Sequence, residues 1–325
     1  MPRLKTPLAW AADRWTLSPR VLRWATTFAL VVSILIILTG GVVRVTGSGL
    51  GCPTWPTCDG QYVIDPISPD LHRMIEQTNR MITGCIVLVV GWVIVAARLQ
   101  KPRVRSITRL AWSQFWLVVA NAVIGGLSVL ADLNPFIVAF HFVTAIALLT
   151  TTALTWHRVH ERPTAYRPTS RARAMSWWLI ALTTVLVVVG TLVSGSGPHS
   201  GDSSDVPRMG FDWVGITVAH AVLGTATLAL GILLWLTLRG AGAAVPRLRA
   251  AVFIVVVVAQ ALLGLVQSVT HLPEALVALH LLGAALVWVG ALRVLLDVNP
   301  ELFPSVHTAQ ASVTADSPRA RATVR

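Results

Sequence analysis

The chain has 325 residues, of which 54% are hydrophobic and only 12% are charged, and its formal net charge is +12. Soluble globular proteins carry about 25% charged residues and disordered chains are poor in apolar residues, so both classes are excluded. The basic residues stand in short clusters between apolar runs, which is typical of membrane-protein loops and does not indicate a nucleic-acid surface.

Eight apolar stretches of about the ~20 residues that cross a bilayer follow one another along the chain. We therefore predict an all-α polytopic membrane protein. The first stretch is too long for the apolar region of a signal peptide. The predicted spans are residues 24–43, 73–97, 107–130, 137–157, 175–194, 212–238, 249–270 and 274–296, preceded by a tail (1–23) and followed by a polar, disordered tail (297–325).

The Lys and Arg residues are distributed asymmetrically between the two sides of these spans. Of the 26, all but Arg44, Arg73, Arg80 and Arg208 fall in the tails and in the even-numbered connections. The positive-inside rule then places both termini in the cytoplasm of a multi-pass protein, which we assign to a bacterial cell membrane.

The first connection, on the predicted non-cytoplasmic side, carries two cysteines in the sequence GCPTWPTC. A disulfide between Cys52 and Cys58 suits an oxidising compartment. Its role stays open between a structural crosslink and a redox-active pair. The third cysteine, Cys85, lies inside a span and is read as a packing residue.

Two segments of the chain resemble each other, residues 118–145 and 257–284, and they align His141 with His280. The tetrapeptides TGSG and SGSG echo each other after the first and fifth spans. Because four spans are an even number, the halves have the same orientation, and the repeat is parallel. We therefore predict two four-helix bundles, residues 24–157 and 175–296, joined by a cytoplasmic linker at 158–174.

Three histidines, His141, His220 and His280, lie inside spans four, six and eight at similar depth. Ionisable residues inside a membrane are costly and are candidates for function. Histidines on facing helices of a bundle are typical axial ligands of haem iron, so we predict haem binding here. The remaining histidines near span ends or in loops are read as solvated or interfacial: His157, His160, His199, His271 and His307.

The second span opens with polar residues, HRMIEQTNR. Glu76 and Asn79 are three residues apart and share a helix face. The repeat places Asn79 where a fourth histidine would complete the symmetry. Glu76 is either a carboxylate beside a haem-sized pocket or an interfacial group paired with Arg73 or Arg80.

These motifs together resemble the haem A synthase family over residues 24–296. The resemblance rests on GGVVRVTGSGLGCPTWPTC, on IEQTNR and on the three histidines inside spans. It implies oxidation of the C8 methyl of haem O to a formyl group by successive hydroxylations. The product is haem A for terminal cytochrome oxidase.

The resemblance also implies roles for particular residues. His220 and His280 would bind the iron of a haem b cofactor, and His141 with Asn79 would face the substrate haem O. Glu76 would be catalytic, and Cys52 would pair with Cys58. The chain departs from the family where Asn79 replaces a histidine, which leaves either an open iron face or a contact from His72, and residues 195–212 contain no cysteine.

Three other readings remain at this point. A membrane b-type cytochrome would transfer electrons without modifying haem, a transporter would use the parallel repeat, and a scaffold would bind haem without chemistry. The expected partners are haem O, the haem O synthase (protohaem farnesyltransferase), an electron donor and the lipid bilayer, with no nucleic acid.

Overall fold

The computed structural model describes residues 6–60, 70–161, 166–199, 201–202, 206–240 and 242–302. Within these ranges the chain is helical, apart from turns and one isolated bridge between Ser48 and Asp202. A short helix, α1 (Pro7–Arg14), precedes eight long ones. These are α2 (Pro19–Val45), α3 (Leu71–Arg98), α4 (Arg105–Leu130), α5 (Pro135–His160), α6 (Ser170–Ser196), α7 (Trp213–Thr237), α8 (Ala244–Val269) and α9 (Glu274–Val298).

All eight long helices are long and apolar enough to cross a membrane, which confirms the predicted number and class of spans. Most of them extend a few residues beyond the predicted apolar stretches. The largest extensions are at the starts of α2, α6 and α8, whose first turns contain arginines that a hydropathy window leaves out. The side chain of Asp70 accepts hydrogen bonds from two amides of the first turn of α3, and Asp212 does the same for α7.

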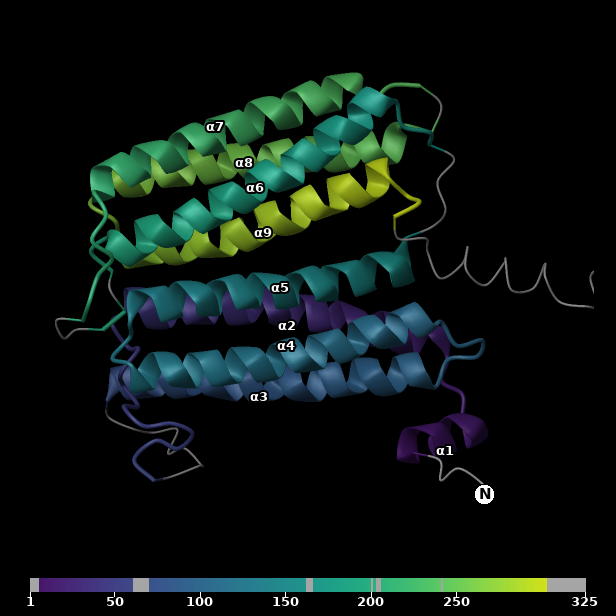
Figure 1. The fold of residues 1–325 in the computed structure, drawn as a ribbon, viewed down its shortest axis with the longest axis horizontal. Coiled ribbons are helices and arrows are strands. Elements are labelled where there is room, and N and C mark those ends of the chain that lie inside the picture. Colours follow the sequence, from purple (N-terminus) through teal and green to yellow (C-terminus); the bar gives the residue numbers. More distant parts are fainter. Residues whose placement is uncertain are drawn as a thin grey trace, which may run out of the picture.

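The long helices form two four-helix bundles that lie side by side (Figure 1). In the N-terminal bundle, α2 and α4 each pack against α3 and α5, and in the C-terminal bundle α6 and α8 each pack against α7 and α9. Helix α9 contacts α2 and α5 of the other bundle. The predicted pair of four-helix bundles is thereby confirmed. The exact residue limits of the halves, linker and tails stay predictions, and residues 162–165 and 303–325, including His307, lie outside the described ranges.

Both described ends of the chain lie at one end of the molecule, which we call the terminal end, and the α2–α3 connection lies at the opposite, disulfide end (Figure 1). Many large apolar side chains are exposed on the outside of the bundles, as expected of a lipid-facing surface. The free thiol of Cys85 is exposed in this way, so its reading as a packing residue is wrong.

A charged cluster joins α5, α8 and α9 at the terminal end. The carboxylate of Glu161 accepts hydrogen bonds from Arg249 and Arg293, and Arg249 also pairs with Asp297. His157 is 6% exposed, so the expectation that it is solvated or interfacial is wrong. The sequence marked it only as a residue near a span end, because the neighbouring charges of Arg249 and Arg293 lie on other helices.

Candidate functional site

The three histidines inside spans lie on α5, α7 and α9, which all begin at the disulfide end. Each of them stands about two turns from the start of its helix. His141, His220 and His280 therefore occupy similar depths. His141 belongs to the N-terminal bundle, and the other two belong to the C-terminal bundle.

Each of these imidazole rings packs against a glycine of the preceding helix. A Cβ atom built on Gly125 would lie 3.0 Å from Cε1 of His141, and one on Gly264 would lie 3.4 Å from Cε1 of His280. A Cβ atom on Gly190 would lie 3.1 Å from Cε1 of His220. The glycines thus leave room for the rings. Gly125 and Gly264 occupy equivalent positions in the repeated segments 118–145 and 257–284, whereas Gly190 lies outside both segments and was missed.

His220 and His280 face each other inside the C-terminal bundle. Their ring centroids are 6.3 Å apart and their planes are inclined by 63°. Imidazole nitrogens bind metal ions at about 2.0 Å, so two rings on opposite sides of one iron have centroids roughly 6 Å apart. The spacing therefore fits a single haem iron between the rings.

The Nδ1 atoms of the three histidines are buried and have no hydrogen-bond partner in the described part of the chain. The ring of His220 also lies near the backbone of Leu186. The three rings are therefore held by close packing on the glycines and not by a hydrogen bond at Nδ1.

The N-terminal bundle has no matching pair of imidazoles among the described residues. Asn79 accepts a hydrogen bond through Oδ1 from the hydroxyl of Thr39 at 2.8 Å. His141 lies on Gly125 and has no described ring partner. Sequence reasoning missed Thr39, because a threonine on an apolar helix carries no signal of its own.

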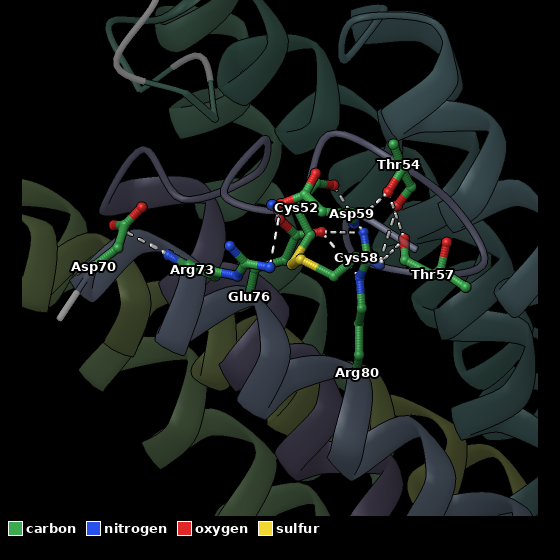
Figure 2. Close-up of a disulfide and its surroundings, with 9 residues drawn as sticks. All are labelled: Cys52, Thr54, Thr57, Cys58, Asp59, Asp70, Arg73, Glu76 and Arg80. Carbon is green, nitrogen blue, oxygen red and sulfur yellow. Dashed lines mark hydrogen bonds and ion pairs between the residues drawn. A yellow bond between two sulfur atoms is a disulfide. The ribbon is translucent and has the colours of Figure 1, made fainter. Parts of the chain in front are cut away.

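The side chain of Glu76 is buried and anchors the loop that carries the disulfide (Figure 2). Its Oε2 accepts a hydrogen bond from the backbone amide of Cys52, and its Oε1 accepts from Nε of Arg80 at 3.0 Å. Arg80 in turn donates to the carbonyls of Cys52 and Thr54 at 3.0 and 3.2 Å. The carboxylate therefore forms the predicted pair with Arg80 and also binds the loop.

The predicted disulfide between Cys52 and Cys58 is present, with Cα atoms 5.0 Å apart (Figure 2). Both cysteines are buried. Trp55, between them, lies on α4 so closely that a Cβ on Gly126 would collide with its ring. The loop is therefore held over the disulfide end of the N-terminal bundle.

Two further residues singled out in the sequence lie beside this loop. Nδ1 of His72 is 3.1 Å from the hydroxyl of Ser48, and Arg73 pairs with Asp59 at 3.1 Å rather than with Glu76. His72 is exposed in the first turn of α3. No hydrogen bond in the described ranges connects it with Asn79 or His141.

The loop also binds the α6–α7 connection of the other bundle. Gly49 donates its amide to the carbonyl of Gly201 at 2.8 Å, and Leu50 donates to Oδ2 of Asp202 at 3.1 Å. The two bundles are thus joined at the disulfide end by contacts that the sequence did not indicate.

Replacing Gly190 with valine is expected to reduce the haem content of the purified protein strongly. The added side chain would occupy the space of the His220 ring and displace it from His280. Absorption spectra and haem-to-protein ratios measure this loss. The matched control is Gly91→Val, since nothing lies within 4 Å of a Cβ built on Gly91. A normal haem spectrum in Gly190→Val would contradict the assigned ring position.

Comparison with known proteins identifies the family of this chain. Residues 23–292 match the model of the COX15-CtaA family, described as cytochrome oxidase assembly protein. The chain is 33% identical to a protein named Heme A synthase from Lysinibacillus sphaericus over 124 residues, which are 38% of this chain and 40% of that relative.

Two longer matches carry the same name. A Heme A synthase of Geobacillus thermodenitrificans is 27% identical over 221 residues, covering 63% of this chain and 69% of the relative. A Heme A synthase of Staphylococcus epidermidis is 24% identical over 210 residues, covering 59% of this chain and 68% of the relative. The shared segments thus range from about two fifths to about two thirds of the relatives' lengths, whereas the family model covers nearly all eight spans. This chain belongs to the COX15-CtaA family of cytochrome oxidase assembly proteins.

Proposed function

We propose that this protein is a haem A synthase, a membrane oxidoreductase that converts the C8 methyl of haem O to a formyl group. The observation that carries the proposal is the pair of buried imidazoles, His220 and His280, whose 6.3 Å ring separation fits one iron. Membership of the family and the name shared by its relatives support the same reaction.

In this proposal His220 and His280 hold the iron of a haem b through their Nε2 atoms. A haem held by both of these imidazoles would supply electron transfer. Gly190 and Gly264 fix the two rings against rotation by close packing. Residues of the C-terminal bundle therefore hold and orient the cofactor and do not touch the methyl group that reacts.

The N-terminal bundle holds the substrate haem O. His141 is the one imidazole at the matching depth there, and Asn79 is a poor iron ligand that is already bonded to Thr39. One axial position of the substrate iron is then left without a strong ligand from α3. His72 would reach it only by giving up its contact with Ser48.

Glu76 is the proposed catalytic carboxylate. Its position at the disulfide end, between the loop and Arg80, suits either the stabilisation of positive charge on the reacting carbon or the transfer of a proton. Arg80 and the Cys52 amide hold the carboxylate in place. The Cys52–Cys58 disulfide keeps that loop closed over the bundle.

The haem O that this enzyme uses would come from a haem O synthase, and electrons from a donor in the same membrane. We also propose that both termini lie in the cytoplasm of a bacterial cell and that the disulfide end lies on the outer side, which the distribution of Lys and Arg supports.

The test is turnover in membranes that contain the protein together with a haem O synthase. Haems are extracted and separated, and the expected product is haem A with some of its alcohol precursor. Membranes without this protein should contain haem O but no haem A. Haem O left unchanged beside a bound haem b would favour the rival function, a b-type cytochrome that only transfers electrons.

A further inference from the structure

Arg44 is a charged side chain at the interface of the two bundles that has no carboxylate partner in the described part of the chain. Its Nη2 donates to the backbone carbonyl of Ser194 on α6 at 2.7 Å, and its Nε is shielded from solvent without a partner. The carboxylates at this end are already bound. Asp202 accepts from the amide of Leu50, and Glu76 accepts from Arg80 and Cys52.

Neighbouring contacts place this guanidinium next to the histidine pair. A Cβ on Gly41, three residues before Arg44, would lie 2.7 Å from Cδ1 of Leu281, the residue after His280. Ser194 is one turn beyond Gly190, which carries the ring of His220. Arg44 therefore lies about one turn from the two rings, towards the disulfide end.

A guanidinium without a counter-ion in a weakly polar interface is costly, and its planar fork matches the geometry of a carboxylate. A haem carries two propionate carboxylates on one edge of its ring. With that edge towards the disulfide end, a propionate would meet Arg44, which has no carboxylate partner in the described ranges.

We propose that Arg44 binds a propionate of the haem held between His220 and His280. The inference rests on the proposed function, because it requires that haem to be present. Both bundles would then contribute residues to the cofactor site, because Arg44 lies on α2 of the N-terminal bundle. The positive charge disfavours the ferric iron, so it raises the midpoint potential of the haem.

The experiment compares Arg44→Gln, Arg44→Lys and the control Arg208→Gln, which removes one positive charge from an exposed residue of the α6–α7 connection. Each protein is loaded with natural haem b or with its dimethyl ester, which has no carboxylates. Loss of haem to excess apomyoglobin and the midpoint potential are measured. Arg44→Gln should lose natural haem about tenfold faster, as one charge-assisted hydrogen bond predicts, and its potential should become more negative.

Arg44→Lys should behave more like the wild type, and Arg208→Gln should match it. With the dimethyl ester, the wild type and Arg44→Gln should lose haem at the same rate. Unchanged retention and potential in Arg44→Gln would overturn the inference, as would an equally large effect with the ester. If Arg44→Gln does not fold, equal retention of both haems by the wild type overturns it. A wild type that binds no haem instead refutes the proposed function itself.

Discussion

Purified His280→Ala protein is expected to lack the low-spin haem b spectrum that we expect of the wild type, and His220→Ala is expected to lack it as well. Each substitution removes one of the two rings that face each other at 6.3 Å, and the remaining imidazole has no second ligand opposite. The measurement is the reduced-minus-oxidised spectrum together with the haem-to-protein ratio. Expected loss is near complete, because low-spin haem b needs two strong axial ligands.

The matched control is His199→Ala, whose ring lies in the α6–α7 connection and is 2.9 Å from the carbonyl of Leu272. This variant should keep its haem b. His141→Ala should also keep haem b but lose the capacity to bind haem O. A full haem b spectrum in His280→Ala would show that the iron is held elsewhere.

The second large effect is expected from Glu76→Gln, which should abolish haem A formation while haem b remains bound. The amide can still accept a hydrogen bond from Cys52 but carries no charge and cannot act as a base. General acid–base or electrostatic roles typically contribute about 10²–10⁴ in rate, so haem O should accumulate in place of haem A. Chromatography of the extracted haems measures the ratio directly.

Asp59→Asn is the control for Glu76→Gln. It removes a carboxylate from the same loop, but its ion pair with Arg73 is largely solvent-exposed and contributes little. Haem A formation should therefore stay close to that of the wild type. If Glu76→Gln made haem A at the wild-type rate, the carboxylate would be an anchor of the disulfide loop and not a catalytic group.

The parts of the structure that depend on composition were predictable. Spans need a fixed length of apolar residues, so all eight helices were found, and the largest differences in bounds are the arginine-containing first turns of α2, α6 and α8. The repeat and the spacing of His141 and His280 gave the depth of the site. The disulfide followed from two nearby cysteines in one loop.

The parts that depend on contacts between distant segments were not predictable. Asn79 bonds to Thr39 and Arg44 to Ser194, and neither partner differs from ordinary residues of an apolar helix. The contact of Trp55 with Gly126 depends on how the loop folds back over α4. A single sequence reports the period of a helix but not which helix packs on each of its faces.

The measurement that tests the central claim most directly is the haem content and axial ligation of the purified wild-type protein. Pyridine-haemochrome analysis gives the haem type, and electron paramagnetic resonance with near-infrared magnetic circular dichroism identifies the axial ligands. We predict one bis-histidine haem b per chain, accompanied by haem O, its alcohol or haem A. A protein without haem, or one whose haem b has a single histidine ligand, would contradict the assignment of His220 and His280.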